Sequence, residues 1–158
     1  MNLAHLLPEL RSNSSLKRLV KSISVGLSLA VDDLPLAARP AVIAAMSESV
    51  DRPVIVVSSR SDRSDVLASA VSEFLDNARN VVHWPAPAAL PYERLPRDTD
   101  QSADFVAALA RVAAAPNESI VFASAASITH AIMSPDDLLR HIYRVRRGDL
   151  LRQADLSA

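Results

Sequence analysis

One stretch decides the fold class, and it reads Pro53-Val54-Ile55-Val56-Val57. The residues after the proline are β-branched and uninterrupted, which is typical of a strand buried on both faces. A second stretch of this kind is Ser119-Ile120-Val121-Phe122-Ala123. Strands with continuous rather than alternating apolar residues need helices on both faces of their sheet. The two stretches therefore predict an α/β domain with a parallel sheet.

Strand and helix patterns alternate four times along the chain. Strands are expected at residues 25–31, 53–57, 80–84 and 119–123. Helices are expected at residues 36–49, around 66–75, at 101–115 and shortly after 124. This alternation predicts a parallel sheet flanked by helices.

The two ends of the chain have different patterns. The first 24 residues predict two short helices, separated by the turn and N-cap residues Ser12-Asn13-Ser14. Residues 140–147 form a basic, strand-like segment, and we expect the chain to be truncated just inside the next element. We therefore expect N-terminal helices (1–24), an α/β domain (25–138) and the start of a following domain (139–158).

Composition excludes several classes of protein. A net charge of −1 is unusual for a free-standing nucleic-acid binder, and the absence of cysteine removes disulfides and thiolate chemistry. No apolar run is long enough for a membrane span, and the N-terminus has no signal-peptide pattern. We expect a cytoplasmic protein that begins at its native Met1 and does not contact membranes.

Glycine content bears on nucleotide binding. The chain has only two glycines, Gly26 and Gly148, so it cannot form a Walker loop or a dinucleotide fingerprint. We therefore expect no bound cofactor. The turn where a phosphate loop would lie reads Val31-Asp32-Asp33-Leu34. Its two carboxylates are either metal ligands, an acid/base pair or N-caps of the next helix, and capping is the favoured interpretation.

Histidine spacing argues against a metal site. No two of the four histidines are four residues apart on one helix, and the set is His5, His83, His130 and His141. His83, next to Trp84, is expected to be packed and partly buried. We predict no metal ligands and no catalytic residue in this chain.

Residues 84–98 form the most distinctive segment and read Trp-Pro-Ala-Pro-Ala-Ala-Leu-Pro-Tyr-Glu-Arg-Leu-Pro-Arg-Asp. Four prolines exclude a regular helix or a central strand, so we expect an ordered surface loop held by its aromatic residues. Its interaction candidates are Trp84, Tyr92, Glu93 and Arg94. The alternative is an inert Ω-loop packed by its own side chains.

A second group of candidates lies near the C-terminus. It comprises the arginines of the basic segment, Arg140, Arg144, Arg146 and Arg147. Their density is suited to contacts with a phosphate backbone, but a solvated edge strand protected by charge is the favoured interpretation.

Three segments carry a resemblance to a known family. Residues 84–98 resemble the tryptophan-to-"LPYE-x-L-x-x-D" segment of bacterial transcription-repair coupling factors, the Mfd family. Residues 53–59 are similar to the family's second strand. Residues 120–128, with Ser134-Pro135 after them, are similar to a strand and helix shared with the excision-nuclease subunit UvrB. The matches follow the family's order from about residue 23 to 150.

The resemblance implies the N-terminal UvrB-like module of a coupling factor, with a RecA-like, P-loop-NTPase-like fold. Its nucleotide site would be degenerate, because Val31-Asp32-Asp33-Leu34 replaces the Walker sequence of UvrB. The span between Tyr92 and Gln101 is too short for the DNA-clamping hairpin of UvrB, which favours the coupling factor. The alternatives are a UvrB-like damage-binding subunit and an unrelated α/β interaction domain.

The same resemblance implies partners and a role in nucleotide excision repair. This module would be a scaffold rather than an enzyme, make intramolecular contacts and carry the following domain, which recruits UvrA. The full-length family member is an ATP-dependent DNA translocase that displaces stalled RNA polymerase from damaged DNA. Its ATP and magnesium sites and its contacts to RNA polymerase and duplex DNA would lie in other domains.

Overall fold

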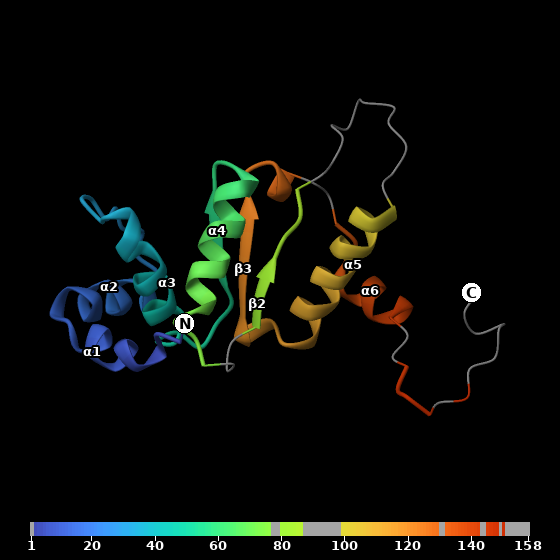
Figure 1. Cartoon of the computed structure of the whole chain (residues 1–158), viewed down its shortest axis with the longest axis horizontal. Helices are drawn as coiled ribbons and strands as arrows, with labels where there is room; N and C mark the ends of the chain where they lie inside the picture. Colours follow the sequence, from blue (N-terminus) through green and yellow to red (C-terminus); the bar gives the residue numbers. More distant parts are fainter. Residues whose placement is uncertain are drawn as a thin grey trace.

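The computed structural model describes residues 2–76, 80–86, 99–129, 132–142, 145–148 and 150 (Figure 1). Its helices and strands alternate through most of the chain. In chain order they are η1 (Ala4–Leu6), α1 (Leu7–Ser12), α2 (Ser14–Ser24), η2 (Leu36–Ala38), α3 (Arg39–Ser47), β1 (Val54–Ser58), α4 (Ser61–Ser72), β2 (Asn80–His83), α5 (Thr99–Ala114), η3 (Pro116–Glu118), β3 (Ser119–Ser124), η4 (Ser127–Thr129) and α6 (Pro135–His141).

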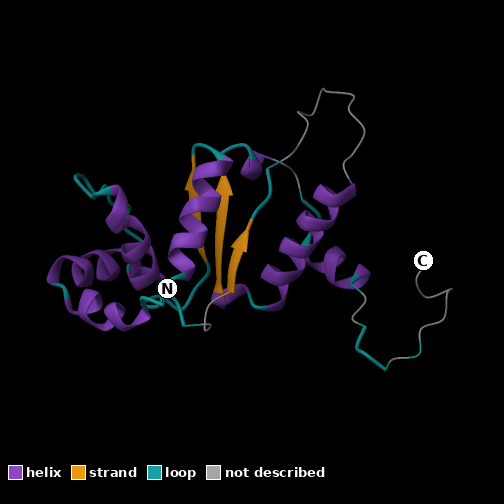
Figure 2. Ribbon diagram, viewed as in Figure 1, coloured by secondary structure: helices purple, strands orange, loops and turns teal. Residues whose placement is uncertain are grey.

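The three strands form one parallel sheet in the order β1-β3-β2 (Figure 2). Val54 pairs with Ile120 and Val81 pairs with the same residue from the other side. Every residue of the central strand β3 is buried. The predicted α/β class, with a parallel sheet flanked by helices, is confirmed.

Helices cover the sheet on opposite faces. Ile120 and Phe122 of β3 pack in one cluster with Ala68 and Val71 of α4. Val121, which alternates with them, packs instead with Val82 and with Ala108 of α5. Because successive strand residues point to opposite faces, α4 and α5 lie on the two sides of the sheet.

The N-terminal helices share the larger of these clusters. Leu7 of α1, Leu16 of α2 and Ala44 of α3 belong to the cluster that contains Phe122. Asn13 caps α2 as expected, since its side-chain oxygen accepts the backbone N–H groups of Ser15 at 2.9 Å and Leu16 at 3.3 Å. The two predicted short helices are confirmed, whereas the predicted division of the chain at residues 24 and 138 stays a prediction.

The strand predicted at residues 25–31 is wrong. Helix α2 runs to Ser24 and closes in a turn, in which Gly26 adopts φ +82° and the N–H of Leu27 donates to the carbonyl of Ser22 at 3.1 Å. Residues 27–31 are then irregular and exposed. Apolar residues alone did not make a strand here, because a strand also needs a partner for its backbone groups.

The basic segment near the C-terminus is also not the predicted strand. Arg140 and His141 end helix α6, and the described residues 142 and 145–148 are not in a strand. The Ser134 hydroxyl caps α6 by accepting the N–H of Asp137 at 3.2 Å, and Pro135 occupies the first turn. Acidic residues in the first turn and basic residues in the last turn complement the helix dipole.

Strand β1 is covered on one face only, which corrects the expectation that both faces are buried. Val54 and Val56 pack against the larger cluster, but Ile55 and Val57 are 64% and 50% exposed. Helix α5 contacts β2, at the other edge of the sheet.

Of the helices in the described part of the chain, none combines the length and the hydropathy that a membrane span requires.

Candidate functional site

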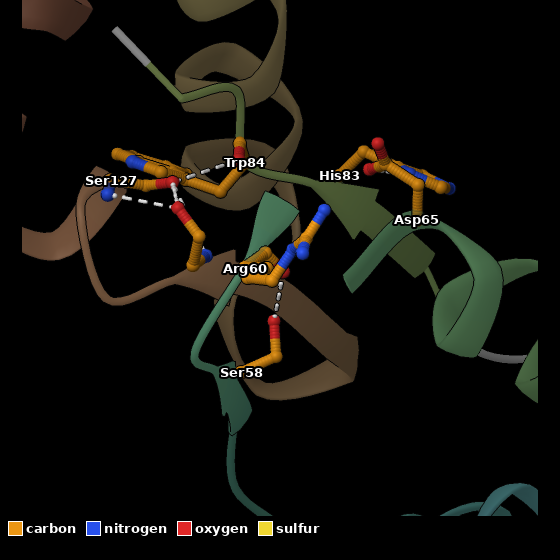
Figure 3. A network of polar contacts seen from close by, with 7 residues as sticks. Ser58, Arg60, Asp65, His83, Trp84 and Ser127 are labelled. Atoms are coloured by element: carbon orange, nitrogen blue, oxygen red, sulfur yellow. Dashed lines mark hydrogen bonds and ion pairs between the residues drawn. The ribbon is translucent and has the colours of Figure 1, made fainter. Parts of the chain in front are cut away.

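The carboxyl ends of the three strands lie at one edge of the sheet. Ser58 ends β1 and is the register partner of Ser124, which ends β3, while His83 ends β2 opposite Phe122. The chain continues from β1 into α4 and from β2 into α5, and these two helices lie on opposite faces of the sheet. In open α/β sheets, ligands bind outside such strand ends. Figure 3 shows the polar groups gathered there.

A pair of buried serines closes the end of β3. The hydroxyls of Ser124 and Ser127 lie 2.6 Å apart, and both residues are almost completely buried. The backbone N–H of Ser127 donates to the Ser124 hydroxyl at 3.1 Å, and that of Ser124 donates to the Ser127 hydroxyl at 3.2 Å. The hydroxyls are thus committed to holding the turn after β3.

Trp84 joins this serine pair to α5. Its backbone N–H donates to the carbonyl of Phe122 at 2.8 Å. Its backbone carbonyl accepts a hydrogen bond from the Ser127 hydroxyl at 3.5 Å (Figure 3). Its indole ring meets Phe105 edge to face, with centroids 5.2 Å apart. The start of the proline-containing segment is therefore held on one side by β3 and the turn after it, and on the other side by α5.

The turn from β1 into α4 contains an ion pair. Both Nε and Nη2 of Arg60 donate to the Asp62 carboxylate at 3.0 Å, and the Ser58 hydroxyl donates to the carbonyl of Arg60 at 2.6 Å. The hydrogen bond from Arg60 lowers the pKa of Asp62, and a backbone hydrogen bond from Arg63 acts in the same direction. Asp62 thereby places its negative charge in the first turn of α4, where the helix dipole favours an anion.

His83 contacts the carboxylate of Asp65 on α4, with Nδ1 and Oδ1 3.2 Å apart. Their side chains are 47% and 65% exposed, so the expectation of a packed, partly buried histidine is wrong. The end of β2 lies beside the first turns of α4, and the ring points out to Asp65 (Figure 3). A histidine and the carboxylate that orients it are two of the three members of a nucleophile-activating triad. Among the described residues, His83 makes no hydrogen bond to a serine hydroxyl.

The segment Val31-Asp32-Asp33-Leu34 precedes the first described strand, so it is not one of the strand ends that form this edge. Asp32 and Asp33 are exposed, and Asp33 adopts φ +59°. The favoured capping interpretation is wrong, since the N-cap residues of η2 and α3 are Pro35 and Ala38, and neither helix has a side-chain cap. The described ranges contain no group of three or more histidine, cysteine or acidic residues able to hold a metal ion.

The structure describes only some of the other residues that the sequence suggested as interaction candidates. Tyr92, Glu93, Arg94 and Arg144 lie outside the described residues. Arg146 and Arg147 are exposed, and Arg140 contacts Asp137 on its own helix at 3.5 Å.

Sequence reasoning missed most of the polar network. Arg60, Asp65 and Ser127 were not proposed as site residues, although Arg60 and Ser127 follow strand ends by two and three residues. That position was the available signal, because parallel strands bring the residues after their carboxyl ends together. Comparison of this chain with protein-family models, with curated proteins and with solved structures finds no match in any of the three.

Proposed function

We propose that this chain is the N-terminal UvrB-like module of a bacterial transcription-repair coupling factor, built on a RecA-related fold with a degenerate nucleotide site. In this role it is a cytoplasmic scaffold in nucleotide excision repair. It contacts the rest of the coupling factor and carries the domain that recruits UvrA. ATP hydrolysis, RNA-polymerase binding and DNA translocation belong to other domains of that protein.

One observation carries the proposal. The three segments that resemble the family coincide with the three strands and the residues that follow them. Residues 53–59 contain β1, residues 84–98 follow β2, and residues 120–128 contain most of β3. Segments that follow the family's order and that contain or directly follow strands of one sheet are harder to attribute to chance than isolated motifs.

The polar network at the strand ends supports a scaffolding role. Hydrogen bonds of Ser124, Ser127 and Trp84 fix the point where residues 84–98 leave the sheet. A rigid framework that presents a loop is the usual arrangement for recognition. Asp62 already occupies the anion-favouring first turn of α4, which disfavours a bound phosphate there.

The proposal is tested by adding this chain to a purified coupling factor that lacks its own N-terminal module. We expect stable capture of that truncated protein and weak capture of isolated UvrA, because the recruiting domain follows this module in the family. Failure to capture the truncated coupling factor would overturn the proposal. Strong capture of UvrA alone would instead place the docking surface on the α/β domain.

Two binding measurements separate the alternatives. Titration calorimetry with magnesium-ATP should be flat, since the chain has no glycine-lysine cradle. Gel shifts at moderate salt should show only weak, damage-independent binding to duplex DNA, as a net charge of −1 allows. Micromolar ATP binding or tight, damage-dependent DNA binding would favour a UvrB-like damage-binding subunit.

A further inference from the structure

A pocket of about 260 Å³ is lined by residues of α1, of α2 and of the segment after α3. Figure 1 shows α1, α2 and α3 on the side of the molecule away from α5. It is lined by three cationic residues, two apolar residues and a serine, namely Arg11, Lys17, Lys21, Leu16, Val20 and Ser49. Leu16 and Val20 form its apolar floor, and both pack against the main core cluster. The three cationic lining residues are exposed.

Charge is concentrated at this pocket. Lys17 and Lys21 are the only lysines of the chain, and both line it. They lie one turn apart on α2, where like charges repel and destabilise a helix. Neither ammonium group forms an ion pair with a described residue, whereas Arg11 contacts Glu48 at 3.6 Å.

The same region has a charge opposite to that of the whole chain. Residues 1–24 carry four cationic side chains and a single acidic one, whereas the chain as a whole has a net charge of −1. Helix α2 contains no acidic residue. A local excess of one charge steers partners of the opposite charge to a surface.

We propose that this pocket binds an acidic, amphipathic peptide segment of a partner protein. Carboxylates of the peptide contact Lys17 and Lys21, and one apolar side chain rests on Val20 and Leu16. The volume accommodates about one large side chain. Nucleic acid fits less well, because no aromatic residue lines the pocket to stack a base and a phosphate chain would leave the apolar floor unused. This inference does not depend on the proposed repair function.

Fluorescence anisotropy of the full chain tests the inference with three labelled probes. The first is a 12-residue peptide of glutamates with interspersed leucine and phenylalanine, the second is a 12-residue polyglutamate, and the third is a 12-nucleotide single strand. We expect the mixed peptide to bind most tightly, with a Kd that rises with salt. The double variant Lys17→Glu/Lys21→Glu should weaken that binding by roughly tenfold or more.

Arg18→Glu is the matched control. Arg18 lies on the same helix but does not line the pocket, so its reversal should leave the affinity nearly unchanged. Val20→Ala should weaken binding of the mixed peptide but leave binding of polyglutamate unchanged. Circular dichroism of each variant checks that the helices persist.

Three results would overturn the inference. If Arg18→Glu weakened binding of the mixed peptide as much as Lys17→Glu alone, the peptide would be attracted by net charge and not by this pocket. Preferential binding of the oligonucleotide, lost in the lysine variants, would make this a nucleic-acid surface. Flat titrations with all three probes would mean that the pocket has no ligand of this kind.

Discussion

The indole of Trp84 and the ring of Phe105 meet edge to face, with centroids 5.2 Å apart and planes inclined by 72°. This contact joins the residue after β2 to helix α5, although 21 positions separate the two residues along the chain. Trp84 also packs against the smaller cluster of Val82, Ala108 and Val121. The contact therefore fixes how the segment after β2 leaves the sheet.

Phe105→Ala should lower the free energy of unfolding by about 2 kcal/mol, less than for a fully buried aromatic residue, because Phe105 is partly exposed. Urea denaturation measures the loss. Trp84 is the only tryptophan, so its fluorescence reports directly on the same contact. Val106→Ala, at an exposed neighbouring position, is the control and should change little. Equal losses for both variants would show that the ring contact contributes nothing specific.

The buried serine pair gives a second prediction. Ser127→Ala leaves the Ser124 hydroxyl and a backbone N–H without their partner, which should cost about 1–3 kcal/mol in unfolding free energy. The double variant Ser124→Ala/Ser127→Ala should cost less than the sum of the single changes, because both hydroxyls are removed. Ser72→Ala, where an exposed hydroxyl contacts the carbonyl of Ser69, is the control. Strict additivity in thermal or urea denaturation would contradict the mutual hydrogen bond.

Continuous apolar runs predicted the interior of the fold well. The run from Ile120 to Ala123 became the fully buried central strand, because such a sequence is stable only between two helical layers. Residues 25–31 have a similar apolar content but are exposed and irregular. The difference lies in whether a neighbouring strand pairs with the segment, which local sequence does not encode.

The polar groups of the site were less predictable. Asp65 is four residues into α4 and meets His83 only because that helix lies beside the end of β2. In contrast, Ser134, Pro135 and Asp137 are local sequence features that indicate the start of α6. The arginines that follow them led instead to the prediction of a basic, strand-like segment. Local capping chemistry was therefore available from the sequence, whereas contacts between elements were not.

The third prediction concerns the pKa of Asp62. The hydrogen bonds from Arg60 hold it below the ordinary value of 3.8. A pKa lowered by folding contributes stability above the unfolded value, and this contribution is lost as the pH falls through the folded value. The effect is therefore complete above about pH 5 and is lost progressively at lower pH. Carboxyl NMR titration should give a midpoint below 3.8 for Asp62.

Arg60→Gln should bring the Asp62 midpoint back toward its ordinary value, because it removes the largest cause of the shift. Arg18→Gln, on the distant helix α2, is the control and should leave the Asp62 titration unchanged. A midpoint that does not respond to Arg60→Gln would mean that the backbone N–H of Arg63 dominates instead.

The last prediction concerns the uncovered face of β1. Ile55 and Val57 are exposed there, and the strand carries no charged residue that would discourage pairing with another strand. Among the described residues, no strand pairs with its outer edge. An uncharged, β-branched edge of this kind favours association with a second strand. Ile55→Lys should therefore reduce concentration-dependent self-association in sedimentation velocity and change the free energy of unfolding by less than about 1 kcal/mol.

Val56→Lys is the matched comparison, because Val56 alternates with Ile55 and packs against the main core. A lysine there would be an unpaired charge next to apolar side chains, so we expect a loss of about 3 kcal/mol or more, and unfolding if the domain is only marginally stable. The contrast between adjacent positions tests which face of β1 is covered. Strong destabilisation by Ile55→Lys, equal to that of Val56→Lys, would mean that another part of the protein covers the exposed face. Unchanged self-association in a folded Ile55→Lys variant would mean that the β1 edge is not the contact.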